Sequence, residues 1–345
     1  MNILQKSSIL KFLNKSSLKG RALIFPVLVL VLVICFFASL FCGSTTVDVF
    51  TAFKDMLKGE TESADFKILF YLRLPRALGA VLAGAGLALS GAIIQAVLGN
   101  PMASPGTIGV NAGAGLAAII FIAIFPAALP FLPIAAFLGA LVATLLIYLI
   151  AAKTDCEKLS LILVGIAVGS ILTAAISLIK NFFPDAVYDA TVFSVGTLSG
   201  LDISSLFPAG YIIIAGFITA FVLHRGLDIL NLGEVTAKSL GIRVKSMQFL
   251  LLITASILAG SAVSFSGLLG FIGLIVPHIG RRVIGGEHKK LIPFCALFGP
   301  IILLVSDLIS RIIFAPYEIP VGILLSFIGC PFFIFLIITK KGYNK

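Results

Sequence analysis

The chain has 345 residues, of which 59% are hydrophobic and 12% are charged, and its formal net charge at pH 7 is +10. Its mean hydropathy is +1.16. This composition excludes an ordinary soluble globular protein and indicates an integral membrane protein, in which the 33 glycines allow helices to pack closely. A basic excess is also typical of nucleic-acid binding, so the placement of the charges has to decide between the two interpretations.

The first predicted membrane span covers residues 22–42 and follows a basic head, residues 1–21, that contains five Lys and Arg residues. A cleaved signal peptide is the competing interpretation of this segment. The apolar run reaches the length of about 20 residues that a helix needs to cross the hydrocarbon core, which is longer than the apolar part of a signal peptide. We therefore expect a retained span.

The stretch from Ala77 to Ala152 contains no Asp, Glu, Lys or Arg over 76 residues. Proline and glycine interrupt it near Pro101 and again around Pro130, which divides it into three spans. The same reasoning along the whole chain predicts an all-α integral membrane protein with about ten transmembrane helices in one domain, residues 22–339, followed by a short tail, residues 340–345. The predicted spans are residues 22–42, 77–98, 107–125, 133–152, 159–179, 206–223, 246–263, 266–282, 291–310 and 319–339.

Ten spans place both termini on the same side of the membrane, and the positive-inside rule decides which side that is. The head, the tail and the loops on their side hold 18 Lys and Arg residues, whereas the opposite side holds seven. Because cytoplasmic loops carry the basic excess, we expect both termini in the cytoplasm and the protein in the cell (cytoplasmic or inner) membrane. The net positive charge is then a topology signal, and no nucleic-acid partner is expected.

Five separated motifs carry the most specific signal in the chain. In order they are Leu72-Arg73-Leu74-Pro75-Arg76, Ser90-Gly91 with Gln95, Asn100-Pro101-Met102-Ala103 through Gly109, the segment Gly270 to Arg281 with Pro277-His278, and Glu318-Ile319-Pro320-Val321-Gly322. This ordered series resembles the permeases of ABC importers for iron–siderophore complexes, haem and cobalamin, the FecCD-type family, over about residues 45–339. One departure is Phe193, which stands ahead of Gly196 where the family commonly has Trp.

The resemblance implies a permease subunit with the fold of a type II ABC importer, which carries an iron chelate, a ferric siderophore first, into the cytoplasm. Haem and cobalamin remain alternative substrates. The chain contains no G-x-x-x-x-G-K-[ST] sequence, so ATP would be used by a separate ABC ATPase subunit, and the permease itself would be neither an enzyme nor the holder of a cofactor. The further implied partners are an extracytoplasmic substrate-binding protein, a second permease subunit (a second copy or a paralogue) and membrane lipid.

The cytoplasmic loop 224–245 mixes charged residues with leucines, which favours a short amphipathic helix or a pair of helices beneath the membrane. An ordinary solvated loop is the alternative. The resemblance implies that this loop contacts the ATPase subunit, and we centre the contact on Gly233, Glu234 and Lys238.

Arg73 and Arg76 stand three residues apart at the outer end of the second span, where they share one helix face. They could anchor the span at the interface, as basic residues near helix ends often do. The resemblance implies instead that they dock the binding protein, together with Arg311, by meeting its acidic residues. Asp307 lies four residues before Arg311, so we expect the two to pair.

The turn from Lys153 to Ser160 is the place where the resemblance implies a cytoplasmic gate, and we assign Lys158 and Leu159 to it. His278 invites a haem-ligand hypothesis, but a lone histidine in an apolar span is more often a structural hydrogen-bonding residue. The five cysteines form no Cys-x-x-Cys pair, and we expect no metal site in the chain.

An ion-coupled secondary transporter is the main rival from another class. Such proteins usually carry ionisable residues deep in their spans, and the long central stretch has none. A membrane-embedded enzyme would need a polar catalytic cluster, and no H-E-x-x-H or comparable constellation occurs in the sequence.

Overall fold

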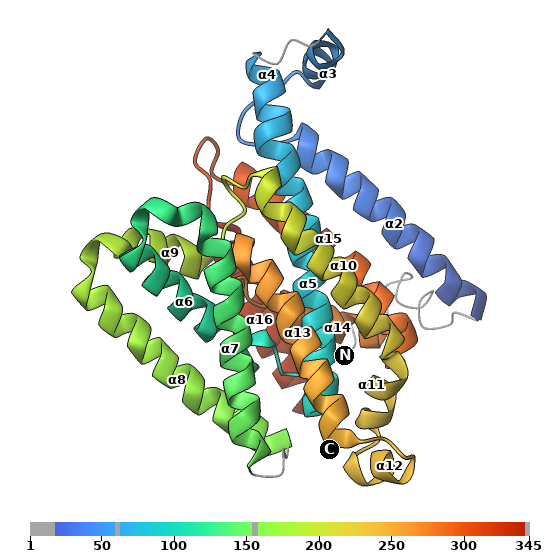
Figure 1. The fold of residues 1–345 in the computed structure, drawn as a ribbon. Helices are drawn as coiled ribbons and strands as arrows, with labels where there is room; N and C mark the ends of the chain where they lie inside the picture. The colour runs from blue at the N-terminus through green and yellow to red at the C-terminus, as the bar shows by residue number, and fades with distance from the viewer. Residues whose placement is uncertain (1–17, 59–62, 154–157, 342–345) are drawn as a thin grey trace.

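The computed structural model describes residues 18–58, 63–153 and 158–341, and over these it is a bundle of helices (Figure 1). Most of the basic head and the end of the tail, residues 1–17 and 342–345, lie outside the described residues. Each of the ten predicted spans coincides with a helix of the described part. These helices are α2 (Leu18–Phe41), α5 (Leu74–Leu98), α6 (Val110–Ile124), α7 (Leu132–Ala152), α8 (Lys158–Phe182), α10 (Ile203–Val222), α13 (Val244–Ser266), α14 (Ile272–Ile284), α15 (His288–Ile312) and α16 (Val321–Lys341).

The lengths of these helices differ in a way that sequence patterning did not show. Within the described ranges, seven candidate spans are long and apolar enough to cross a membrane, whereas Val110–Ile124 and Val321–Phe335 are shorter apolar stretches. Helix α14 has 13 residues, because it begins only after an irregular turn in which Phe271 adopts a φ of 67°.

Several short helices join the spans, and among them only those in the loop 224–245 were predicted. At the outer end, α3 (Val49–Lys58), α4 (Ala64–Lys67) and the π-helix η1 (Ile68–Arg73) lead from α2 into α5. Helix α9 (Val187–Val195) follows α8. At the opposite end, the loop between α10 and α13 contains α11 (His224–Asn231) and α12 (Glu234–Ser239), so the predicted pair of helices is confirmed. Figure 1 shows α3 and α4 at one end of the molecule and α12 at the other.

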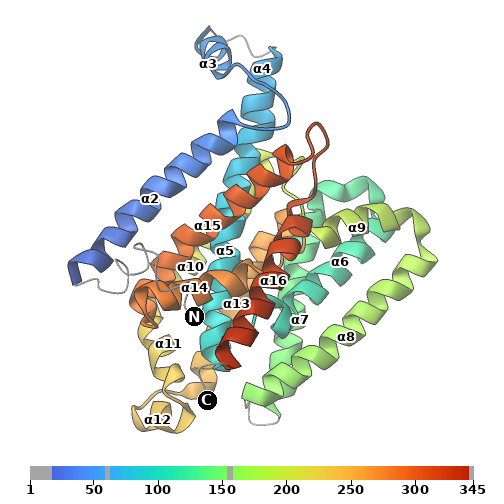
Figure 2. The ribbon, with the colours of Figure 1, turned by 180° about the vertical axis from the view of Figure 1, so that it is seen from behind.

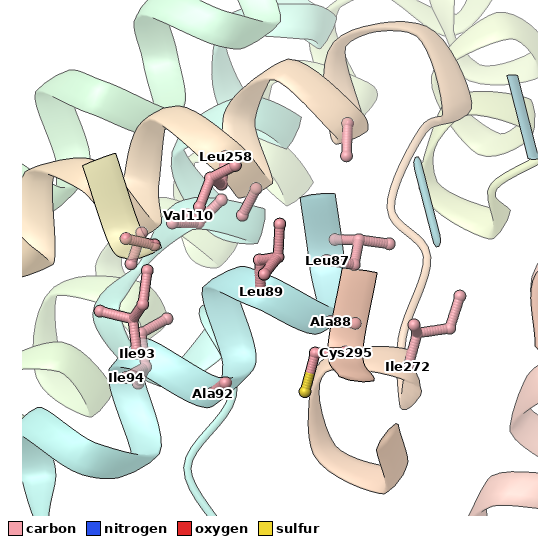
Figure 3. Close-up of a cluster of buried hydrophobic side chains, with 14 of the residues drawn as sticks. Leu87, Ala88, Leu89, Ala92, Ile93, Ile94, Val110, Leu258, Ile272 and Cys295 are labelled. Carbon is pink, nitrogen blue, oxygen red and sulfur yellow. The ribbon is translucent and has the colours of Figure 1, made fainter. Parts of the chain in front are cut away.

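Helix α5 is the centre of the bundle and is buried along most of its length. Pro75 occupies its first turn, where a missing N–H costs nothing, and Gly99 ends it with a φ of 60°. Its leucines, isoleucines and alanines pack against Val110 of α6, Leu258 of α13 and Cys295 of α15 (Figure 3). By contrast, α2 lies along the periphery of the bundle (Figure 2), and many of its large apolar side chains face outward as in a lipid-facing helix.

The motif residues Ser90, Gly91 and Gln95 serve the packing of α5. Ser90 Oγ donates to the Ala255 carbonyl of α13 at 2.7 Å, and Gln95 Nε2 donates to the Gly273 carbonyl of α14 at 3.2 Å. A Cβ on Gly91 would lie 1.8 Å from the Gly273 oxygen, so the two backbones touch there. The motifs therefore mark the places where α5 meets its neighbours most closely.

Candidate functional site

The outer end of the bundle holds a cluster of charges, which we call the outer network: Arg73, Arg76, Asp307 and Arg311, which are buried, and Glu318, which is partly exposed. Arg76 Nε donates to both carboxylate oxygens of Asp307, at 2.9 and 3.1 Å, and its Nη1 lies 2.5 Å from Glu318 Oε2. Arg311 Nε lies 3.2 Å from Asp307 Oδ2, so the predicted pairing of these two residues is confirmed. The network joins α5 to α15 and to the loop that enters α16.

Arg73 and Arg311 also bind the end of α2. Arg73 Nη1 donates to the carbonyls of Leu40 and Phe41 at 2.8 and 3.0 Å, and its Nη2 donates to the carbonyl of Thr45 at 2.5 Å. Arg311 Nη2 donates to the Ser39 carbonyl at 3.1 Å and to the Ser39 hydroxyl at 2.7 Å. The last carbonyls of a helix lack partners within it and carry its negative end, so the two guanidinium groups cap α2.

The docking role that the resemblance implies would need the three arginines to be exposed at the outer surface, but the structure buries them. Arg73, Arg76 and Arg311 are 4%, 8% and 2% exposed, because carbonyls and carboxylates from distant parts of the chain surround their guanidinium groups. Direct docking of a binding protein by these side chains stays a prediction, and it would require them to exchange their present partners.

Glu318 is the most outward member of the network. Its side chain is 31% exposed and also accepts a hydrogen bond from Ser44 Oγ at 2.9 Å. Burial acts to raise the pKa of Glu318, but the hydrogen bond and the charge of Arg76 outweigh it, so the pKa lies below its ordinary value. The carboxylate is therefore ionised at neutral pH.

The opposite end of the molecule carries the predicted ATPase contact. Gly233 starts α12 with a φ of 100°, and Lys238 Nζ forms an exposed ion pair with Glu234 at 2.9 Å. Beside them Leu232, Val235 and Leu240 are 62%, 83% and 58% exposed. Apolar side chains that protrude from such a tip, with charges around them, are typical of a protein-binding surface.

Sequence reasoning missed Val235, although a signal was present, because it is the one large apolar residue in the six-residue helix Glu234–Ser239. We name the surface made by Leu232, Gly233, Glu234, Val235 and Lys238 the coupling tip.

The predicted gate falls partly outside the described residues, because residues 154–157 are not described. Lys158 starts α8, and its Nζ lies 2.8 Å from the position that a Cβ on Gly99 would take, at the end of α5. Its charge thus stands beside the negative end of that helix. Leu159 is exposed. The gate assignment stays a prediction.

One face of the bundle is hollowed where α9, the turn before α14 and α16 meet. A cavity of about 590 Å³ opens there, and none of its described lining residues is charged. Its walls are small or apolar, with two hydroxyl groups. The lining residues are Ser194, Val195, Leu268, Gly270, Gly322, Ile323, Ser326, Phe327, Cys330 and Pro331.

The same face is partly assembled by the remaining motifs. The Leu268 N–H donates to the Phe193 carbonyl at 3.0 Å, and the Gly322 N–H donates to the Gly196 carbonyl at 3.2 Å. The backbone of Phe193 thus holds Leu268, which lines the cavity. His278, which invited a haem-ligand hypothesis, is not among the described residues that line the cavity. Groups of three or more residues that could hold a metal ion were not found in the described part of the chain.

Comparisons with known proteins agree with this architecture. The sequence profile of the FecCD transport family matches residues 31–339. The Fe(3+)-citrate import system permease protein YfmE of Bacillus subtilis is 42% identical over 282 residues, which are 81% of this chain and 84% of that protein. The ferric enterobactin permease FepD of Escherichia coli is 37% identical over 93% of this chain and 96% of its own length.

A further relative and a solved structure also resemble this chain. The hemin transport permease HmuU of Yersinia pestis is 35% identical over 84% of this chain and 89% of its own length. A solved structure described as an inward-facing conformation of a putative metal-chelate type ABC transporter superimposes with a TM-score of 0.82 at 29% identity, covering 92% of this chain and 99% of that one.

Proposed function

The chain belongs to the FecCD transport family, and from this premise we propose that it is the permease of an ABC importer that carries a ferric siderophore or a similar iron chelate across the cell membrane. The family and the fold make the chain a multi-pass permease subunit, which performs no catalysis of its own. The relatives named for Fe(3+)-citrate and ferric enterobactin support an iron chelate as the substrate. The relative named for hemin supports haem as the alternative substrate.

The uncharged cavity on the α9–α16 face is the observation that carries the substrate class. A free metal ion, or the coupling ion of a secondary transporter, would need ionisable or strongly polar ligands in the membrane. A chelate already satisfies the coordination of its iron, so it can pass a wall of glycine, serine and apolar side chains without being held. The cavity therefore supports passage of a chelate.

We propose that a second permease subunit, either a copy of this chain or a paralogue, covers this face. Helix α8 is little buried by the rest of the chain, and Leu163 and Ile166 on it are more than half exposed, as is Phe327 on α16. A second subunit that packs beside the cavity would convert an open groove into a closed pathway.

The partners that drive and load the permease are assigned to its two ends. We propose that an ABC ATPase binds the coupling tip, centred on Gly233, Glu234 and Lys238, because apolar side chains protrude there. The binding protein is proposed to dock above the outer network. Arg73, Arg76 and Arg311 would then act chiefly by holding the ends of α2, α5 and α15 beneath the docking surface.

The test is ATP-driven uptake in proteoliposomes that contain this chain with its cognate ATPase and binding protein, using radiolabelled ferric siderophore, haem and cobalamin in parallel. Uptake of the siderophore that requires all three proteins and ATP is the expected result. Uptake of haem or cobalamin but not of the siderophore would contradict the assigned substrate. Uptake that does not depend on ATP would contradict the assignment as an ABC importer.

A further inference from the structure

The inner end of α15 is tied to the loop that carries the coupling tip. Asp228 of α11 accepts two hydrogen bonds on one carboxylate oxygen, from the His288 backbone N–H at 3.0 Å and from His288 Nδ1 at 2.7 Å. His288 is the first residue of α15 and is fully buried. Because a carboxylate accepts only, Nδ1 carries the proton in this contact.

Asp228 thereby acts as an N-cap supplied from another helix. Glu287 stands at the N-cap position of α15 but makes no side-chain capping bond. The first N–H groups of a helix need acceptors and form its positive end, so a carboxylate placed there is favoured by both hydrogen bonding and charge. Both of these hydrogen bonds between α11 and α15 therefore depend on one atom, Oδ1 of Asp228.

Helix α15 runs from this attachment at its inner end to the outer network, and it packs against α5 along the way. In the middle of the pair the two backbones touch, because a Cβ on Gly84 would lie 2.6 Å from the Gly299 oxygen. At the outer end, Arg76 of α5 is bound to Asp307 of α15. Two helices in backbone contact and ion-paired at one end move together more readily than they slide.

The inner end of α5 is tied to the same region. Gln95 accepts a hydrogen bond from Arg281 of α14 and donates one to the Gly273 carbonyl. Helix α14 ends at Ile284, four residues before His288. Figure 2 shows α11 between α12 and the inner ends of the long helices.

We propose that Asp228 is a positioning residue for transport: it fixes the coupling loop to α15, so that a displacement of α12 by the ATPase moves the α5–α15 pair and, at its far end, the outer network. The inference rests on the proposed function, since it needs an ATPase at the coupling tip. It adds to that function the contact through which a movement of the ATPase is transmitted to the transmembrane helices.

The experiment measures the number of ATP molecules hydrolysed per substrate imported in the reconstituted transporter described above. Asp228→Ala removes the acceptor, whereas Asp228→Asn keeps an oxygen at the same position. Glu287→Ala is the matched control, because it deletes a neighbouring carboxylate whose ion pair, with Lys290, lies at the surface and within α15 and the residue before it. Co-purification of the ATPase with each variant reports assembly.

We expect ATP per substrate to rise about tenfold in Asp228→Ala, which corresponds to about 1.4 kcal/mol, and to stay within about twofold of wild type in Asp228→Asn and Glu287→Ala. A residue that merely stabilises the fold would lower uptake and ATP hydrolysis in proportion, and such an unchanged ratio would overturn the inference. If ATP per substrate also rose tenfold in Asp228→Asn, the inference that Asp228 acts as a hydrogen-bond acceptor at the end of α15 would be wrong. If the wild-type transporter shows no ATP-driven uptake at all, it is the proposed function that fails.

Discussion

Removal of the carboxylate at the centre of the outer network should cost more stability than any other single change at this end of the molecule. Asp307 is fully buried, and its two oxygens lie 2.9 to 3.2 Å from nitrogens of Arg76 and Arg311. Asp307→Ala leaves two guanidinium groups buried without it, and loss of one partner of a buried ion pair costs about 3–5 kcal/mol. An unfolding entropy of about 2.1 cal/mol/K per residue means that, in a chain of 345 residues, each kcal/mol lowers the unfolding midpoint by about 1.4 °C, so we expect a drop of about 4–7 °C.

The assay is thermal unfolding of the purified permease in detergent, without binding protein or ATPase. The chain contains no tryptophan, so the buried thiol of Cys295 is the better reporter, read with a thiol-reactive fluorogenic dye after the other four cysteines have been changed to serine. Glu318→Gln is the comparison variant. It should cost only about 1 kcal/mol, because this side chain is partly exposed and Arg76 keeps Asp307.

The result that would refute this reasoning is a midpoint for Asp307→Ala within about 2 °C of the parent. The network would then not hold the outer ends of α5 and α15 together. A second check is the double variant Asp307→Ala/Arg76→Ala, which should cost less than the sum of the two single changes, because removal of both charges leaves fewer of them unpaired.

Three further predictions follow from the coupling tip, the helix contacts and the network. Val235→Asp should abolish co-purification of the ATPase and leave the unfolding midpoint unchanged, because the side chain is 83% exposed. Gly91→Ala should cost about 1–3 kcal/mol, since its Cβ would lie 1.8 Å from the Gly273 oxygen, whereas Gly169→Ala in α8 meets nothing within 4 Å and should be neutral in the same unfolding assay. Because the pKa of Glu318 is lowered in the folded protein, its ionised carboxylate contributes its full stabilisation above the pKa of the unfolded chain and loses it as the pH falls through the folded pKa. The difference in unfolding midpoint between wild type and Glu318→Gln should therefore be constant from about pH 6 to 8 and shrink below about pH 4.

The spans could be predicted because burial in lipid leaves a direct mark on the sequence. The charge-free stretch Ala77 to Ala152 and its prolines locate α5, α6 and α7 to within a few residues. The short helices α3 and α9 could not be predicted in this way. With 10 and 9 residues they are too short to cross a membrane, so a search for long apolar runs does not find them.

The candidate site was predictable in its residues and not in its geometry. Arg73 and Arg76 share a helix face by their spacing, and the pairing of Asp307 with Arg311 follows from their separation of four residues. The burial of Arg76 depends on Asp307 and Glu318, which lie 231 and 242 residues further along the chain. Contacts of that range leave no periodicity in a single sequence, so exposure could not be inferred.

The position of α2 explains why so many charges are placed at the outer end. This helix lies at the edge of the bundle and buries little apolar surface, and between helices in lipid there is no hydrophobic driving force to fix it. Hydrogen bonds from Arg73 and Arg311 to the carbonyls of its last turn supply that attachment, in a setting where water competes weakly. Arg311 also pairs with Asp307, and Arg76 pairs with Glu318. A protein that formed an ion pair with any of these side chains from outside would therefore weaken the contacts that hold the outer ends of α2, α5 and α15 together.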